Sequence, residues 1–78
     1  MMSDVLRSLF AEVLDVDISR LNEDSSPETL REWDSLAAME LVSAIEEKFK
    51  IQLSTKEIMK MTTIGLARKT LQSKNVEV

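Results

Sequence analysis

The sequence EWDSL at residues 32–36 decides how the chain is organised, because it lies where an irregular acidic segment gives way to a long helical pattern. Asp34 is a residue type that favours the position before the first turn of a helix, where its carboxylate accepts a backbone N–H. Ser35 then falls beside unsatisfied N–H groups and the positive end of the helix dipole. A phosphate ester on this hydroxyl would be stabilised there. The simpler alternative is that both residues only cap the helix.

The residues after this stretch predict a helix over about 35–50 with one apolar face. The inward residues of this helix are Ala38, Leu41, Val42, Ile45 and Phe49. Leu36 projects roughly opposite that face and Met39 falls near its border, so we expect both side chains to be at least partly exposed next to the serine. Glu40, Glu46 and Glu47 should surround them and suit a partner that places basic residues around an apolar contact. The alternative for Leu36 is that it folds back against the preceding loop.

A first helix is predicted from residue 3 or 4 to about Asp15. Its apolar side is formed by Val5, Leu6, Leu9, Phe10, Val13 and Leu14. Residues 16–33 then form a long loop, which is unusual in so small a domain unless it is anchored or functional. Its expected anchors are Ile18, Leu21 and Leu30. Trp33, the only tryptophan, is expected to pack against the core rather than to stack on something bound.

Two further helices are predicted in the C-terminal part of the chain. Ser54 and Glu57 fit a capping box, which predicts a short helix. This helix should run to about residue 61 and turn Ile58 and Met61 inward. Thr62 or Thr63 should cap a last helix. The inward residues of the last helix are Ile64, Ala67 and Leu71. Residues 73–78 have little to bury and are expected to fray.

The composition narrows the class of protein. The chain has 78 residues, one glycine, one proline, and neither cysteine nor histidine. The length fits one domain, and helical spacing with so few turn residues predicts an all-α fold. Without a thiol or an imidazole, the common nucleophiles and neutral-pH proton shuttles are missing, which argues against an enzyme. A small enzyme using Asp34 and Glu40 for acid–base chemistry is an alternative that no predicted pocket supports.

Charge and hydropathy limit the partners and the location. The net charge of −4 argues against a nucleic-acid partner. No stretch is long enough for a membrane span and the N-terminus lacks the apolar core of a signal peptide, so we expect the chain in the cytoplasm. A monomer is a separate expectation. Asp15, Asp17 and Ser19 resemble the start of a calcium loop. Arg20 and Ser26 then stand where glycine and glutamate are needed, so no metal site is predicted.

Four stretches carry a resemblance to a known family: DSL at 34–36, MELV at 39–42, IEEKF at 45–49 and TTI at 62–64. At this spacing the chain resembles the acyl carrier proteins over nearly its whole length. The resemblance implies one domain spanning residues 1–78, folded as a four-helix bundle. It implies three longer helices, one short helix, and the long loop between the first two. It also implies a carrier and not an enzyme.

The resemblance implies that Ser35 is esterified by a 4′-phosphopantetheine arm taken from coenzyme A, with Asp34 supporting the modification. The thiol of the arm would hold an acyl or related group as a thioester for partner enzymes of fatty acid, polyketide or related biosynthesis. Expected partners are a phosphopantetheinyl transferase and acyl-loading, condensing and acyl-transfer enzymes, recognised through Leu36, Met39 and Glu40. The alternative is an unmodified interaction or regulatory module that uses the same apolar patch.

The chain departs from carriers of primary fatty acid synthesis in three places. The short helix carries Lys56 and Lys60 where those carriers are often acidic, alanines follow Leu36, and Trp33 replaces a small residue. These features resemble carriers dedicated to specialised pathways. They bear on the cargo and the partner enzymes, and not on the attachment chemistry.

Overall fold

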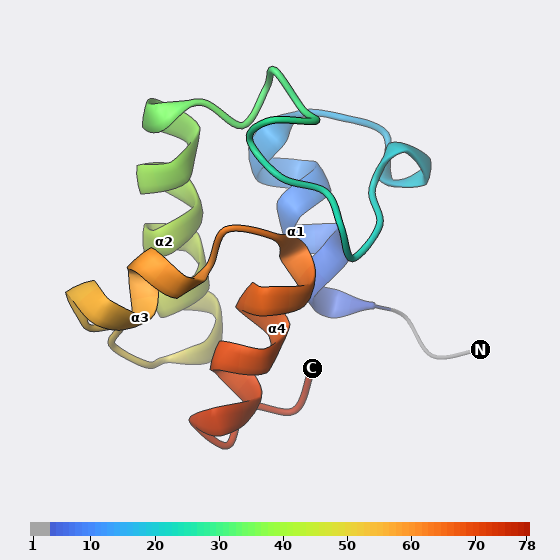
Figure 1. The fold of residues 1–78 in the computed structure, drawn as a ribbon. Helices are drawn as coiled ribbons and strands as arrows, with labels where there is room; N and C mark the ends of the chain where they lie inside the picture. Colours follow the sequence, from blue (N-terminus) through green and yellow to red (C-terminus); the bar gives the residue numbers. More distant parts are fainter. Residues whose placement is uncertain (1–3) are drawn as a thin grey trace.

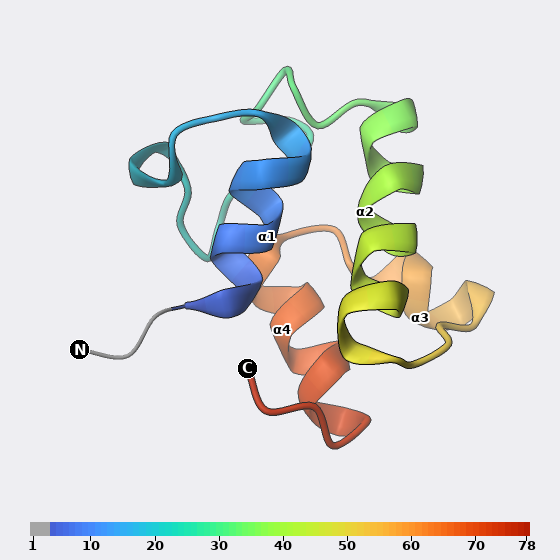
Figure 2. The ribbon, with the colours of Figure 1, turned by 180° about the vertical axis from the view of Figure 1, so that it is seen from behind.

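The computed structural model describes residues 4–78, and in this range it has four α-helices and one 3-10 turn (Figure 1). The elements are α1 (Val5–Leu14), η1 (Ile18–Arg20), α2 (Ser35–Phe49), α3 (Thr55–Lys60) and α4 (Ile64–Ser73). Figure 2 shows α1 and α2 side by side and running in opposite directions, with the long loop joining their ends. The predicted all-α bundle of three longer helices and one short helix is confirmed.

Each helix begins at a side chain that caps it. The N-cap oxygen accepts a backbone N–H three residues further on in all four helices, at Asp4, Asp34, Ser54 and Thr63. The predicted capping box is present: the Ser54 N–H donates to Glu57 Oε1 at 2.8 Å, and the Glu57 N–H donates to Ser54 Oγ at 3.2 Å. Because these bonds satisfy N–H groups that a helix start leaves open, local sequence sets all four starts.

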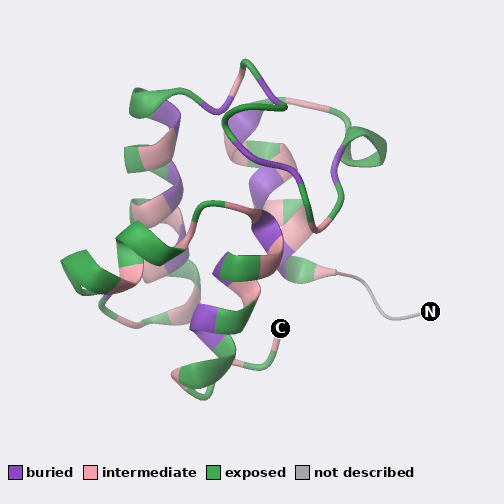
Figure 3. Cartoon of the chain, viewed as in Figure 1, coloured by how far each residue is buried: buried purple, intermediate pink, exposed green. Residues whose placement is uncertain are grey.

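The core lies between the three longer helices, and Figure 3 shows the buried positions on their facing sides. Its largest fully buried side chains are Leu6, Phe10, Ile45, Ile64 and Leu71. Trp33 joins them from the loop, is only 4% exposed, and meets Phe10 edge to face with ring centroids 5.2 Å apart. The prediction that Trp33 packs against the core is therefore confirmed. Such an aromatic pair stabilises the fold beyond the area that it buries.

The loop between α1 and α2 is held by buried side chains, although one predicted anchor is wrong. Leu21 and Leu30 are each 4% exposed, as expected for anchors. Ile18 is 43% exposed, because it opens η1, a single turn that projects at the edge of the molecule (Figure 1). Ser25 is buried instead, and its Oγ accepts the Asn22 N–H at 2.9 Å.

An ion-pair cluster that the sequence analysis missed joins the start of α1, the loop and α4. The Arg68 guanidinium lies 2.7 Å from Asp4 Oδ2 and 2.8 Å from Glu23 Oε1, and Arg7 lies 2.8 Å from Glu23 Oε2. Hydrogen bonds from Arg68 and Arg7 lower the pKa of Glu23 to about 2, against the opposing effect of burial. The Gly65 N–H also donates to the Glu23 carbonyl at 2.9 Å, so the loop sits directly on α4.

The C-terminal residues fold back, whereas the sequence analysis expected them to fray. The chain turns at Asn75, which has a φ of 66°, and the Val76 N–H donates to the Leu71 carbonyl at 3.0 Å. Arg68 donates to the carbonyl oxygen of Val78 at 3.2 Å. Val76 and Val78 thereby return to the core, and this contact is what the expectation left out.

Some residues that were predicted to face inward are more exposed than expected, chiefly in and around α3. Ile58, which was predicted to face inward, lines a cavity with Phe10 and Trp33 but is still 37% exposed, and Met61 is half-buried. The reason is that α3 lies at the edge of the bundle and contains no buried residue (Figure 3). Val5, at the start of α1, is likewise 41% exposed.

Candidate functional site

The first turn of α2 presents Ser35 at the surface. Asp34 is the N-cap, and its Oδ1 accepts the Ala37 N–H at 2.9 Å. Ser35 is the next residue and is exposed, and its hydroxyl makes no hydrogen bond within residues 4–78. Within that same part of the chain the N–H groups of Ser35 and Leu36 have no acceptor either. A phosphate on the hydroxyl would therefore meet a helix start with open donors, and a second protein could reach it.

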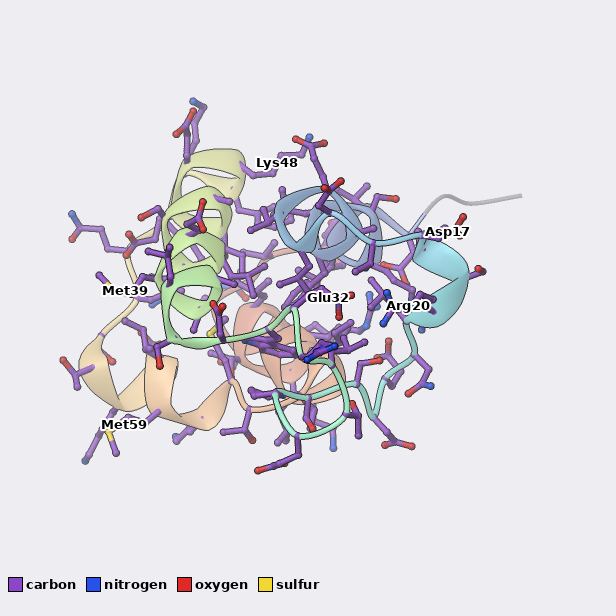
Figure 4. The ribbon with its side chains drawn as sticks, turned by 90° about the horizontal axis from the view of Figure 1, so that it is seen from above. Asp17, Arg20, Glu32, Met39, Lys48 and Met59 are labelled. Atoms are coloured by element: carbon purple, nitrogen blue, oxygen red, sulfur yellow. The ribbon has the colours of Figure 1, made fainter. Side chains whose placement is uncertain are left out.

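Buried and paired residues of the preceding loop fix the position of this turn. Trp33 is buried immediately before Asp34, and the backbone N–H of Trp33 donates to the Leu30 carbonyl at 3.1 Å. Arg20 donates to both carboxylate oxygens of Glu32, at 2.8 and 3.3 Å, and Figure 4 shows the two residues beside η1. The hydrogen bond from Arg20 holds the pKa of Glu32 below its usual value. The site thus combines an exposed hydroxyl with an anchored loop.

An exposed apolar patch continues from Ser35 along α2. Leu36 and Met39 are 67% and 70% exposed, which confirms the predicted exposure. Figure 4 shows Met39 on the outer side of α2. Glu40 and Glu47 are exposed beside them, and Glu12 of α1 completes an acidic margin. We call this surface the α2 patch; its hollow is lined by Glu12, Val13, Leu36, Met39, Glu40, Ser43, Ala44 and Glu47. Glu12 is a member that the sequence analysis missed, since only the packing of α1 on α2 brings it there.

Glu46 does not lie at this margin. It is half-buried, and its Oε2 accepts the Leu53 N–H at 2.9 Å. The carboxylate therefore holds the chain where it reverses after α2, instead of facing the α2 patch. The helical wheel could not show this, because the acceptor is engaged by a residue beyond the end of the helix.

A small apolar cavity of about 50 Å³ lies on the other side of α2. It is lined by Phe10, Trp33, Ala38, Leu41, Val42, Ile45, Ile58 and Met61. A cavity of this size is far smaller than the grooves on the surface of the protein, of which the one between α3 and α4 measures about 550 Å³. The sequence analysis placed these residues in or near the core, but the space between them depends on how α3 meets α2.

The site has no catalytic constellation. The oxygen of Asp34 that faces the helix is engaged by the Ala37 N–H, and no neighbouring base within the described residues contacts Ser35. Residues 4–78 contain no group of potential metal ligands. Within the same range, no helix combines the length and hydropathy needed to cross a membrane. The geometry offers an accessible hydroxyl and a surface for a partner.

Comparison with known proteins gives consistent matches. Residues 4–67 match the family model described as "Phosphopantetheine attachment site". An acyl carrier protein of Chlamydia caviae is 36% identical over 64 residues, covering 82% of this chain and 83% of that protein. The polyketide-8 synthase acyl carrier protein 2 of Streptomyces avermitilis is 30% identical over 69 residues, covering 88% of this chain and 79% of that protein.

A solved structure extends the match to the fold. The solution NMR structure of a holo acyl carrier protein from Geobacter metallireducens has a TM-score of 0.82 and 29% sequence identity. The alignment covers 92% of this chain and 83% of that one.

Proposed function

This chain belongs to the acyl carrier protein family, and we propose that Ser35 is the residue to which its 4′-phosphopantetheine arm is attached. The observation that carries this assignment is the exposed Ser35 hydroxyl on the first turn of α2, which makes no hydrogen bond within residues 4–78. It lies within the residues that match the attachment-site model. The open N–H groups at that turn suit the phosphate of the ester. Asp34 supports the modification by fixing the turn.

The chain acts as a carrier in fatty acid or polyketide biosynthesis and not as an enzyme. When bound, the arm supplies a thiol that holds an acyl group as a thioester, which a chain without cysteine cannot supply itself. The residues of the chain position the arm: Asp34 caps the turn, and Trp33 anchors the loop before it. Proton transfer and oxyanion stabilisation then fall to the biosynthetic enzymes that act on the thioester.

The α2 patch is the surface that we assign to these enzymes and to the phosphopantetheinyl transferase. Leu36 and Met39 offer exposed apolar area next to the attachment point, and Glu40 and Glu47 attract a basic margin on the partner. Methionine suits this role, since its flexible thioether adapts to several partners. Glu46, which the sequence analysis included, is engaged by the backbone and is left out of this proposal.

The cavity behind α2 and the residue types near the site bear on the cargo and its pathway. A cavity of about 50 Å³ cannot take an extended acyl chain, so the group on the arm stays outside the bundle unless α2 and α3 separate. Trp33 and the lysines of α3 support a specialised pathway over a housekeeping one. We place the carrier in the cytoplasm, where coenzyme A can supply the arm. We also propose that it acts as a monomer, since one domain holds both Ser35 and the α2 patch.

The assignment is tested by the intact mass of the purified apo protein after incubation with coenzyme A, magnesium and a broad-specificity phosphopantetheinyl transferase. Wild type should gain the mass of one phosphopantetheine group, and so should the control variant Ser43→Ala, which changes another exposed serine of α2. Ser35→Ala should gain nothing while keeping the helical circular dichroism spectrum. Uptake by Ser35→Ala would reject the site. An unmodified wild type would favour an interaction module instead.

A further inference from the structure

A groove of about 550 Å³ lies between α3 and α4, away from the first turn of α2. Figure 1 shows these two helices beside each other, with α3 at the margin of the molecule. The groove is lined by Glu57, Met59, Lys60, Thr62, Leu66, Lys69, Thr70 and Ser73. None of these residues belongs to the α2 patch or to the cavity behind α2.

Exposed apolar side chains form part of the lining of this groove. Met59 is 71% exposed and Leu66 is 41% exposed, and Figure 4 shows Met59 projecting away from the body of the protein. The wall formed by α4 consists of residues 66, 69, 70 and 73, which is the spacing of one helix face. That face extends over about two turns, or roughly 10 Å, so the groove matches the length of a short helical segment.

The groove carries positive charge that the protein itself does not neutralise. Its only carboxylate, Glu57, accepts the Ser54 N–H at 2.8 Å and pairs with Lys74 at 3.1 Å. These partners, the Ser54 N–H first, lower the pKa of Glu57. Lys60 and Lys69 form no ion pair within the described residues 4–78. The α2 patch has the opposite character, because its charged residues are all acidic.

We propose that the α3–α4 groove is a second docking surface, whose occupant is an acidic amphipathic helix of a partner protein. The apolar face of that helix covers Met59 and Leu66, and its carboxylates meet Lys60 and Lys69. This is the helix-in-groove mode of recognition, with charge setting the choice of partner. An anionic membrane suits the groove less well, because the surface is concave and the whole chain has a net charge of −4.

The docking surface does not depend on the arm, so the test uses the full chain in its apo form. The probe is a labelled synthetic peptide of about 14 residues, roughly four helical turns, with leucines on one face and glutamates on the other. Its partner probe has lysine at every glutamate position. We expect the acidic peptide to bind, to shift the amide NMR signals of Met59, Lys60, Leu66 and Lys69, and to bind more weakly as salt increases.

The double variant Lys60→Gln, Lys69→Gln should lower the affinity for the acidic peptide by about tenfold. The loss comes from two exposed charge pairs and from the apolar contact that these pairs orient. The matched control is Lys48→Gln with Lys50→Gln, which removes the same charge from two exposed lysines at the end of α2. It should change the affinity by less than about twofold, since salt screens distant charges. The lysine peptide should leave the groove signals unchanged.

Four results would overturn the proposal. The first is equal binding of the two peptides, and the second is a set of shifted signals confined to the α2 patch. The third is that the protein binds vesicles of anionic lipid, loses this binding in the groove variant, and does not bind the acidic peptide. That result would assign the groove to a membrane. The fourth is a concentration-dependent dimer that the groove variant abolishes in sedimentation, which would assign it to a second copy of the chain.

Discussion

The loop between α1 and α2 and the helix α3 are ordered in opposite ways. The loop contains only the single turn η1, yet several of its side chains are buried in the protein: Leu21, Ser25, Ser26, Leu30 and Trp33. α3 is a regular helix with a capping box, yet it has no buried residue. Regular secondary structure and burial therefore do not coincide in this chain. Buried side chains hold the loop in front of Ser35, whereas α3 is held by its capping hydrogen bonds, by the Glu57–Lys74 ion pair and by the partly buried Met61 that follows it.

The largest effect should come from the anchor of the loop. Trp33→Ala removes a buried ring that packs on Phe10, and should lower the free energy of unfolding by about 3 to 5 kcal/mol. Met59→Ala is the matched change in α3. It should alter the free energy of unfolding by no more than about 0.5 kcal/mol, because the Met59 side chain is exposed. Urea unfolding followed by circular dichroism measures both. Equal losses for the two variants would break the comparison.

The second effect is a pH dependence that belongs to the loop. The folded pKa of Glu23 is lowered from 4.5 to about 2, so its ion pairs stabilise the protein above pH 4.5 and this stability is lost as pH falls toward 2. With 43% of the Glu23 side chain exposed, solvent screening leaves about 1 kcal/mol of this effect.

Glu23→Gln should remove this part of the pH dependence, measured as the free energy of unfolding from pH 6 to pH 2 relative to wild type. Asp24→Asn removes a neighbouring charge that forms no ion pair with Arg7 or Arg68, and should retain the wild-type dependence of the unfolding free energy on pH. A slope that Glu23→Gln leaves unchanged would show that the cluster does not stabilise the loop.

The third effect compares two helix caps. Ser54→Ala and Thr63→Ala each remove an N-cap bond worth about 1 kcal/mol, but α4 has four buried residues and α3 has none. Thr63→Ala should therefore lower the global stability by about that amount. Ser54→Ala should instead raise amide hydrogen exchange within α3 by about fivefold and leave the global midpoint nearly unchanged. If both variants shifted the global midpoint equally, α3 would not open on its own.

The smallest effect on stability is expected at the docking surface. Leu36→Ala should change the free energy of unfolding by less than about 0.5 kcal/mol, because the side chain is 67% exposed. It should raise the KM of the phosphopantetheinyl transferase several-fold, since apolar contact is lost beside Ser35. The control is Met59→Ala, which should leave that KM unchanged. An unfolding midpoint that falls with Leu36→Ala would place the residue in the core.

Local signals in the sequence were enough to predict the helices and the helix start at which Ser35 is exposed. Asp34, Ser54 and Thr63 are cap residues whose effect extends over one turn, and the structure has them as caps. The exposure of Leu36 and Met39 also followed from helical periodicity alone. These features depend on neighbours within four positions, which a single sequence contains.

The remaining features depend on contacts between distant residues. Arg68 bonds to Asp4 and Glu23 across 64 and 45 positions, so nothing near it in sequence indicates the cluster. Ile18 was expected to anchor the loop, because hydropathy does not show that η1 projects from the body. The wheel placed Glu46 at the α2 patch, because it does not include the chain beyond α2.

The central claim is that the surface hydroxyl of Ser35, presented by an anchored loop, bears the arm. It is tested most directly by locating the group after trypsin cleavage of the modified protein. Cleavage after Arg31 and Lys48 releases peptide 32–48, whose only hydroxyl side chains are Ser35 and Ser43. Fragment spectra of this peptide should place the phosphopantetheine mass on Ser35, eight residues before the alternative. A group on Ser43, or on any other peptide, would contradict the account.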